Sequence, residues 1–319
     1  MTNLILLEHF TSQSNIDCKQ DKIILREAMN IANTIIENFI NHPKLNKLFV
    51  LRNYKLRTIK SEKIIYCPIN KKNSYEKVLN KFVKNDNIIL IAPEINKESI
   101  NYYYKLKDKF KLLGSNFNTI KVFSSKIKTL EVLKKKKIPV IQFSKSNKTL
   151  SNKIVVKPEY GAGSSQVLFA GNEFPKKTKK SLIFQKFYEG IKGSFLMLCS
   201  KGLAKVLCCN EQIVKINKRK ISQTGCIIGG LEPHRKEIEF LAENICRNFR
   251  GFSGIIGVDI VRYKNKWLVL EVNPRFTSSY CALTKSYSYE TVQDVSSFYL
   301  TKHFSDFVPE FIKPYIYNF

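Results

Sequence analysis

A series of short apolar segments in the first third of the chain most constrains its fold. These segments lie at 4–7, 48–51, 63–66 and 88–94. The stretches between them include apolar-periodic patterns that are typical of amphipathic helices, at 26–40, 75–84 and 97–111. Short buried strands that alternate with helices predict a parallel α/β sheet. Such sheets bind ligands beyond the carboxyl ends of their strands, which is where Glu8 and Glu94 fall.

The pattern changes near residue 113, where we expect a boundary between domains. Downstream, the apolar runs predict more strands and fewer helices, with an antiparallel hairpin at 194–214 that turns at Lys201 and Gly202. A helical pattern covers 237–249, and two further strands at 254–263 and 267–272 predict a second hairpin. The predicted domains are 1–113, 114–189 and 190–319.

The charge balance raises the question of a nucleic-acid partner. Lys and Arg total 54 against 26 Asp and Glu, which gives a formal charge of +28. The excess is mostly Lys, is spread along the chain and accompanies heavy use of Asn and Ile, as an AT-rich genome produces without selection for a partner. We therefore expect a solvated basic surface and no specific nucleic-acid partner.

The remaining composition favours a globular protein of the cytoplasm. No apolar run reaches the ~18 residues that a membrane helix needs, so we expect no membrane association. Eight cysteines occur without a CxxC pair, and the four histidines are scattered. We expect reduced, mostly buried thiols and no zinc site of Cys and His ligands.

Three oxygen-bearing side chains form the strongest chemical signal. Glu271 and Asn273 are two residues apart on a predicted strand and therefore share one face. The hairpin brings Asp259 from the neighbouring strand beside them. Hard divalent cations such as Mg²⁺ take carboxylate and carbonyl oxygens as ligands. The pattern therefore predicts a magnesium site.

A glycine and serine turn follows the predicted strand that contains Lys157. The turn contains Gly161, Gly163, Ser164 and Ser165, whose N–H and hydroxyl groups could bind anionic oxygens, while Lys157 supplies a point charge. The turn matches neither the Walker pattern nor the dinucleotide fingerprint. Taken alone, it is equally consistent with an ordinary glycine hairpin.

Taken together, these features resemble the ATP-grasp superfamily in their order and spacing. The resemblance implies an ATP-grasp fold, of mixed α/β and α+β class, with two α+β subdomains that hold ATP and an N-terminal Rossmann-like domain. It implies an ATP-dependent ligase that joins a carboxylate to an amine through an acyl-phosphate and releases ADP and phosphate. The implied cofactors are ATP and Mg²⁺ or Mn²⁺, with two ions.

The resemblance also assigns roles to individual residues. Lys126 and Lys157 are similar to the two phosphate-binding lysines, and the turn at 161–165 is similar to the lid over the β and γ phosphates. The strand at 183–187 corresponds to the hinge that pairs with adenine. Its cofactor-binding residues are Gln185, Lys186 and Phe187, with Glu189 as a ribose ligand.

The same resemblance gives the metal and catalytic residues. Asp259, Glu271 and Asn273 match the metal ligands. Arg275 matches the arginine that steadies the transferring phosphoryl group or acyl-phosphate, so Arg275 and Lys157 are the predicted catalytic residues.

The segments at 6–10 and 273–280 are similar to those of small ATP-grasp ligases that join tyramine to L-glutamate. The family has a glycine-rich stretch after the first strand, and this chain has Thr-Ser-Gln-Ser-Asn at 11–15 instead. We predict that Glu8 and Arg275 bind substrate. Glu8 would recognise the amine, and capping of the local backbone is the alternative role for Glu8.

Two alternative functions stay open. One is another amino-acid or peptide ligase, and the other is a basic nucleotide-binding or nucleic-acid-binding protein without ligase activity. The expected partners are small-molecule amines and carboxylates, and a homodimer is compatible with the sequence.

Overall fold

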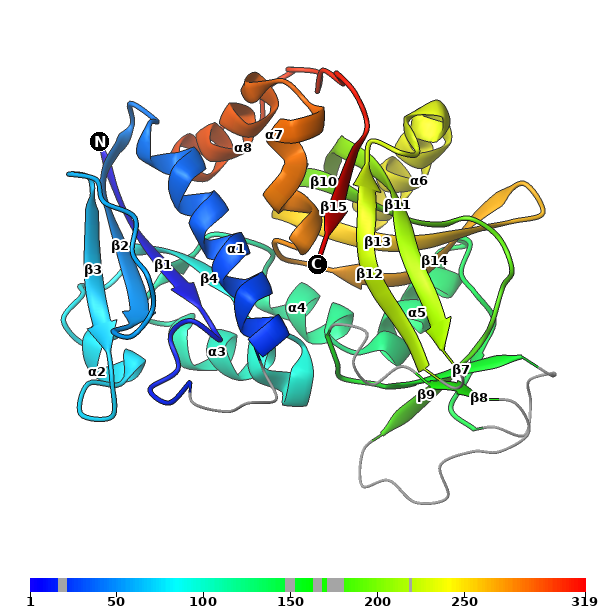
Figure 1. Ribbon diagram of the computed structural model, residues 1–319, viewed down its shortest axis with the longest axis horizontal. Helices are drawn as coiled ribbons and strands as arrows, with labels where there is room; N and C mark the ends of the chain where they lie inside the picture. The colour runs from blue at the N-terminus through cyan, green and yellow to red at the C-terminus, as the bar shows by residue number, and fades with distance from the viewer. Residues whose placement is uncertain (17–21, 147–152, 163–167, 171–180, 218–219) are drawn as a thin grey trace.

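The computed structural model describes residues 1–16, 22–146, 153–162, 168–170, 181–217 and 220–319. Within these residues the strands form two sheets, which lie on opposite sides of the molecule in Figure 1. The smaller sheet is parallel and the larger is antiparallel, so the fold combines the α/β and α+β classes that the sequence predicts.

The smaller sheet has the strand order β3-β2-β1-β4-β5. Its strands are β1 (Thr2–Glu8), β2 (Leu45–Asn53), β3 (Ile64–Ile69), β4 (Asn87–Ile91) and β5 (Lys111–Leu112). Neighbouring strands pair in parallel, with Leu7 of β1 opposite Leu51 of β2 and Leu90 of β4. The carboxyl ends of β1, β2 and β4 therefore lie along one edge.

Helices cover both faces of this sheet. Leu4 and Leu6 of β1 pack towards α1 (Lys22–Ile40), whereas Ile5 and Leu7 pack towards α2 (Tyr75–Leu79) and α3 (Glu98–Leu106). This burial on both faces explains why β1 is a continuous apolar run rather than an alternating one. Along α1, the buried residues recur at helical spacing and form one apolar face: Ala28, Ile31, Ala32, Ile35, Ile36 and Phe39.

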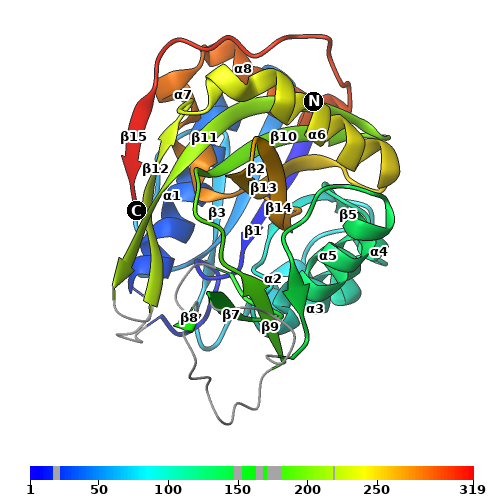
Figure 2. The same cartoon turned by 90° about the vertical axis from the view of Figure 1, so that its right-hand side faces the viewer.

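The larger sheet runs β14-β13-β10-β11-β12-β8-β7-β9-β6, with β15 paired to β12. Its strands are β6 (Phe143–Ser144), β7 (Ile154–Pro158), β8 (Leu168–Ala170), β9 (Leu182–Lys186), β10 (Lys192–Ser200), β11 (Leu203–Asn217), β12 (Lys220–Ile228), β13 (Gly254–Tyr263), β14 (Lys266–Asn273) and β15 (Tyr315–Asn318). Both predicted hairpins are present, β10–β11 and β13–β14. Figure 2 shows β7, β8 and β9 grouped below the long strands β10 to β14.

The remaining helices pack on the two faces of the larger sheet. They are α4 (Phe117–Phe123), α5 (Lys126–Lys135), α6 (Arg235–Asn248), α7 (Leu283–Ser286) and α8 (Tyr289–Thr301), with three short 3₁₀ helices η2 (Ile95–Lys97), η5 (Glu232–His234) and η6 (Ser278–Ala282). Residues of α4, α5 and α6 share one core cluster with β10 and β13. Residues of α1, η6 and α8 pack against the opposite face.

The hydrophobic core is continuous across residue 113. One cluster contains Leu4 and Ile35 from the N-terminal part together with Leu196, Phe276 and Tyr299 from the rest of the chain. In Figure 1, α1 and α8 lie between the two sheets. The division into domains at 113 and 189 stays a prediction, because this core joins the predicted units.

Three elements differ from the sequence-based expectation. The predicted helix at 75–84 ends at Leu79, and the one at 97–111 ends at Leu106. The strand β15 was not predicted, because its short segment depends on pairing with the distant strand β12. None of the described helices is long and apolar enough to cross a membrane.

Candidate functional site

The three predicted metal ligands lie on the β13–β14 hairpin. Asp259 pairs directly with Glu271, and Gly257 pairs with Asn273. Directly opposed residues of an antiparallel pair project from the same face, about 4.5–5.5 Å apart at their Cβ atoms. Asp259, Glu271 and Asn273 therefore form one group of oxygen atoms on the face of the sheet that also packs against α1 and η6.

Burial and mutual repulsion dominate the electrostatics of this pair of carboxylates. Burial, followed by the neighbouring charge of Glu271, raises the pKa of Asp259 to about 7. Burial also acts to raise the pKa of Glu271, but the charges of Lys126 and Lys157 outweigh it and lower that pKa. The two carboxylates and the two lysines therefore form one closely coupled group of charges.

Lys126 lies at the first position of α5, where the N-cap Ser125 accepts a hydrogen bond from the N–H of Lys128. The Nζ atom of Lys126 lies 2.8 Å from Oε1 of Glu271 and 2.5 Å from the carbonyl oxygen of Gly161. The side chain is buried, with 6% of the residue exposed. Lys126 therefore links the metal-ligand strand to the start of the glycine turn.

Lys157 is the fourth residue of β7 and is half-buried. Burial lowers its pKa, and the carboxylates of Glu271 and Asp259 act in the opposite direction. These interactions place the ammonium near the metal-ligand group, and its role in phosphate binding stays a prediction. Gly161 follows the strand, whereas Gly163, Ser164 and Ser165 lie outside the described residues.

The predicted hinge strand β9 lies between β7 and β6. The backbone N–H of Lys186 donates to the carbonyl of Gln142, and that of Phe187 donates to the carbonyl of Lys153. Both N–H groups are thus already used within the protein. An adenine edge would therefore pair with backbone carbonyl oxygens of this segment or with backbone groups beyond Phe187.

Gln185, the fourth residue of β9, has an amide that suits a polar ligand. The residue is only 1% exposed, and among the described residues neither its Oε1 nor its Nε2 has a hydrogen-bond partner. A buried amide without partners costs free energy unless a ligand or water satisfies it. An adenine ring offers both a donor and an acceptor on one edge, so the residue fits the predicted cofactor.

Glu189 is in a different environment from the other predicted cofactor residues. Its carboxylate pairs with Lys153 in an exposed ion pair, in which 72% of the Glu189 side chain is accessible. This hydrogen bond and the charge of Lys153 lower the pKa of Glu189. The contact to Lys153 occupies one carboxylate oxygen, and the ribose role of Glu189 stays a prediction.

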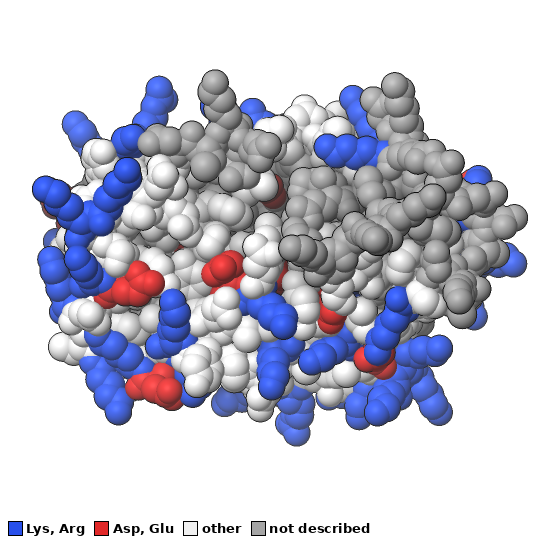
Figure 3. All heavy atoms as spheres, turned by 90° about the horizontal axis from the view of Figure 1, so that it is seen from below, with Lys and Arg blue, Asp and Glu red and all other residues white. Residues whose placement is uncertain are grey.

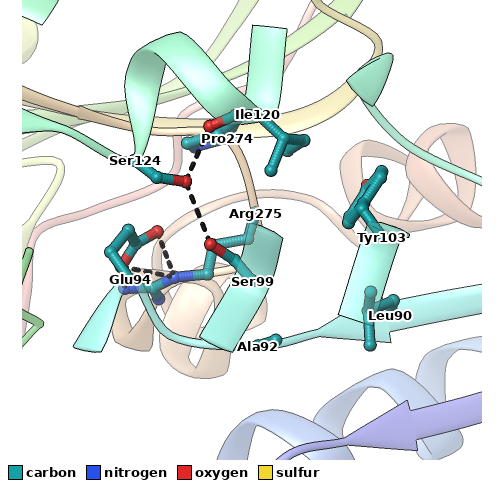
Figure 4. A pocket seen from close by; sticks show the side chains of 9 residues that line it. All are labelled: Leu90, Ala92, Glu94, Ser99, Tyr103, Ile120, Ser124, Pro274 and Arg275. Atoms are coloured by element: carbon teal, nitrogen blue, oxygen red, sulfur yellow. Dashed lines mark hydrogen bonds and ion pairs between the residues drawn. The ribbon is translucent and has the colours of Figure 1, made fainter. Parts of the chain in front are cut away.

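Arg275 joins the two sheets. Its Nε atom lies 3.0 Å from Oε1 of Glu94 and its Nη2 atom lies 2.9 Å from Oε2, so the ion pair is bidentate (Figure 4). Glu94 follows β4, and Arg275 follows β14. Burial acts to lower the pKa of Arg275, but the charge of Glu94 outweighs it and raises that pKa. The pair fixes the loop after the metal-ligand strand against the N-terminal sheet.

Glu8 ends β1 with its carboxylate turned back onto its own loop. Its Oε2 accepts a hydrogen bond of 2.6 Å from the N–H of Thr11, and its Oε1 accepts one of 3.1 Å from the N–H of Phe10. Burial raises the pKa of Glu8, and these backbone hydrogen bonds act to lower it. These contacts are the capping role that the sequence left open, and the role in amine binding stays a prediction.

Two contacts of the site were not anticipated from the sequence. Gln212 of β11 donates from Nε2 to Oδ1 of Asp259 over 2.8 Å. Ser278 of η6 donates from Oγ to Oε1 of Glu27 on α1. Neither contact has a local sequence signal, because Gln212 and Asp259 lie 47 residues apart and Glu27 and Ser278 lie 251 apart.

The donor set fits a hard divalent cation rather than zinc. Two carboxylates and one amide oxygen are ligands of Mg²⁺ or Mn²⁺. No group of three His, Cys, Asp or Glu side chains with metal-binding geometry occurs among the described residues. The described cysteines are free, and five of them are buried.

Comparison with known protein families finds a match to the middle and later part of this chain. Residues 123–279 match the ATP-grasp domain family model, and strands β6 to β14 all begin within this range. This part of the chain is therefore similar to ATP-grasp domains, the family that the sequence motifs resemble.

Similar proteins include a curated ligase and several solved structures. The tyramine–L-glutamate ligase of Methanocaldococcus jannaschii is 23% identical over 269 residues, which cover 82% of this chain and 79% of that protein. A protein of Archaeoglobus fulgidus assigned to the ATP-grasp superfamily has a TM-score of 0.74 at 22% identity, with both chains fully covered. The L-amino acid ligase of Bacillus licheniformis has a TM-score of 0.62 at 16% identity, covering 94% of this chain and 74% of that one. These likenesses to solved structures show the ATP-grasp fold.

Proposed function

We propose that this protein is an ADP-forming ligase that joins a carboxylate to an amine at the expense of ATP. The observation that carries the proposal is the group of Asp259, Glu271 and Asn273 on one face of the β13–β14 hairpin, with Lys126 within 2.8 Å of Glu271. Oxygen ligands beside lysines are what a magnesium–triphosphate requires. The ATP-grasp domain and the ligase relative support the same class of reaction.

The proposed reaction has two steps. A substrate carboxylate oxygen attacks the γ-phosphorus of ATP, the bond between the β–γ bridging oxygen and the γ-phosphorus breaks, and ADP leaves with an acyl-phosphate formed. The neutral amine then attacks the acyl carbon, the carbon–oxygen bond to phosphate breaks, and phosphate leaves as the amide loses its extra proton to solvent. No protein nucleophile is required, so the residues act by positioning and by stabilising charge.

The residues of this chain divide these tasks. Asp259, Glu271 and Asn273 would hold the divalent cation, which supplies positive charge to the phosphate oxygens. Lys126 and Lys157 would donate to the same phosphates, and the amide of Gln185 would contact the adenine. In our proposal the glycine turn that begins at 161 closes over the phosphates and excludes water.

Arg275 requires a separate assignment, because Glu94 already binds its guanidinium. We propose that the pair holds the exit of β14 in place and that Arg275 adds positive charge next to the acyl-phosphate. Its Nη1 atom donates to the carbonyl of Phe276 over 3.2 Å, so the side chain is held from two directions. Such a fixed cation needs no reorganisation as charge develops.

We rank the candidate substrate pairs by the reactions that similar proteins are named for. Tyramine with L-glutamate is the first pair to test, because the curated relative is named for that reaction. Pairs of amino acids come next, since one of the solved neighbours is an L-amino acid ligase.

The experiment is a measurement of ADP release by the purified protein with ATP, Mg²⁺ and a panel of amines and carboxylates. We expect stoichiometric ADP, phosphate and amide for at least one pair, with the amide identified by mass spectrometry. Release of AMP and pyrophosphate would contradict the acyl-phosphate route. ATP hydrolysis that no substrate pair stimulates would contradict the ligase assignment.

A further inference from the structure

The turn between β4 and α3 has a strained backbone. Asn96 has φ = 50° and Lys97 has φ = 65°, both in the left-handed region. Asn occasionally adopts this conformation, whereas for Lys it is disfavoured by contact of the side chain with the backbone. The N–H of Lys97 donates to the carbonyl of Glu94 over 3.1 Å, and the Glu94 side chain is bound to Arg275. A strained turn persists where the surrounding structure fixes it, and such turns cluster at functional sites.

The Lys97 side chain contacts an aromatic ring at the start of the glycine turn. Its Nζ atom lies 4.9 Å from the centroid of the Tyr160 ring, which is within the range of a cation–π interaction. Lys97 is exposed and Tyr160 is half-buried. Tyr160 lies between Pro158, the last residue of β7, and Gly161. The contact therefore joins the turn after β4 of the smaller sheet to the segment after β7 of the larger sheet.

Exposed lysines are common on this protein, so its contact partner is what distinguishes Lys97. The chain has 54 Lys and Arg, and Figure 3 shows basic side chains around much of one face, with fewer acidic ones among them. Lys107 makes the same kind of contact, but its ring is that of Tyr104, close by in the chain, at 5.9 Å. A contact of that kind follows from chain proximity alone. The contact of Lys97 with Tyr160 instead connects segments of two sheets.

The residues on either side of Tyr160 are bonded to Lys126. The N–H of Lys126 donates to the carbonyl of Glu159 over 3.1 Å, and Nζ of Lys126 lies 2.5 Å from the carbonyl oxygen of Gly161. The same ammonium lies 2.8 Å from Oε1 of Glu271. A displacement of Tyr160 would therefore disturb the lysine that contacts the metal-ligand group.

We propose that Lys97 is a positioning residue that holds Tyr160, and with it the Lys126 ammonium, in the arrangement that binds the phosphates of ATP. The inference rests on the proposed ATP-dependent function and adds to it a residue from the smaller sheet. Lys97 contacts neither the cation nor the nucleotide in this role. A group that is already held in its binding arrangement loses less conformational freedom when a ligand arrives, so the restraint strengthens binding.

The test measures binding of AMP-PNP, a non-hydrolysable analogue of ATP, with Mg²⁺ by isothermal titration calorimetry of the full chain. Lys97→Met removes the charge at similar side-chain length, and Lys97→Arg keeps a cation that can lie over the ring. Tyr160→Leu removes the ring, and Tyr160→Phe keeps it. The matched control is Lys107→Met, which removes one positive charge and one lysine–ring contact at the other end of α3. Thermal melting of each variant checks that it is folded.

We expect Lys97→Met and Tyr160→Leu each to raise the Kd of AMP-PNP about three- to fivefold, as for loss of one exposed cation–π contact. Lys97→Arg, Tyr160→Phe and Lys107→Met should stay within about twofold of the wild type. The double variant Lys97→Met, Tyr160→Leu should bind no more weakly than Tyr160→Leu alone, because the two residues act through one contact. If Lys97→Met weakens binding equally with and without the ring, the lysine acts by its charge alone and the inference is overturned. A wild-type Kd in Lys97→Met overturns it too.

The same measurements separate this inference from the proposed function. Nucleotide binding requires no turnover, so the Kd values decide the inference even where no substrate pair stimulates ADP release and the ligase function fails. If the wild type does not bind AMP-PNP with Mg²⁺, the proposed nucleotide site fails and the inference fails with it. In an active enzyme, Lys97→Met should raise KM for ATP and leave KM for the amine and the carboxylate within about twofold, and an equal rise in all three overturns the inference. If Tyr160→Leu does not fold, Lys97→Met and Lys97→Arg decide, and equal Kd values for these two variants overturn the inference.

Discussion

Replacing Glu94 with Gln should destabilise the whole protein, because Glu94 and Arg275 form the buried ion pair between the two sheets. Glu94 has a side chain that is 3% exposed, and its two oxygens receive three contacts from Arg275, at 2.9, 3.0 and 3.3 Å. Loss of one partner from a buried pair costs roughly 3–5 kcal/mol. The Arg275 side chain is 18% exposed and keeps its bond to Phe276, so we expect the lower limit, about 3 kcal/mol.

Thermal unfolding followed by circular dichroism measures this effect. The unfolding entropy of a chain of 319 residues is about 0.7 kcal/mol per kelvin, so a loss of about 3 kcal/mol lowers Tm by about 4–5 °C. The control is Glu131→Gln, which removes an exposed ion pair to Lys145 at 2.8 Å and should shift Tm by about 1 °C or less. Equal Tm values for the two variants would refute the claim that the buried pair clamps the sheets together.

Three further predictions concern other parts of the structure. Burial lowers the pKa of His9 from 6.5 to about 4, so the unfolded chain takes up a proton first and the contribution of His9 to stability should fall by up to about 3 kcal/mol between pH 6.5 and 4. Because Asp259 titrates in the same range in both proteins, the measurement is the difference in urea unfolding free energy between wild type and His9→Gln, and a difference that does not change with pH would contradict this prediction. Gly254 has φ = 78° and an added Cβ would lie 2.3 Å from the hydroxyl of Tyr299, so Gly254→Ala should cost about 2 kcal/mol or more, and a Tm equal to that of the wild type would contradict this reading. Gln212→Leu removes the donor that orients Asp259, so the Mg²⁺ concentration for half-maximal ADP release should rise about tenfold with Tm unchanged, and an unaltered Mg²⁺ dependence would remove Gln212 from the site.

The sequence was most informative where function depends on local periodicity. Residues two apart on a strand share a face, so the placement of Glu271 and Asn273 follows from the strand assignment alone, and a short hairpin brings Asp259 beside them. The apolar run at 4–7 likewise predicts a strand buried on both faces, as observed for β1. These features require only a correct assignment of neighbouring elements.

Contacts between distant segments were beyond the reach of such reasoning. The pair of Arg275 and Glu94 spans 181 residues and depends on how the loop after β14 packs against the N-terminal sheet. The direction of the Glu8 carboxylate depends on the loop at 9–12, whose N–H groups turn towards it. Strand periodicity places Glu8 at the edge of the sheet but does not say which donors its oxygens meet.

The central claim, that Asp259, Glu271 and Asn273 hold the cation for phosphoryl transfer, is tested most directly by the kinetics of Glu271→Gln. The measurement is ADP release at saturating Mg²⁺, ATP and the best substrate pair, compared with the wild type and with Glu243→Gln, an exposed residue of α6. We predict a fall in kcat of at least ~10²-fold for Glu271→Gln, in a protein that melts cooperatively, and no change for Glu243→Gln. A near-normal kcat in folded Glu271→Gln at saturating Mg²⁺ would contradict the account.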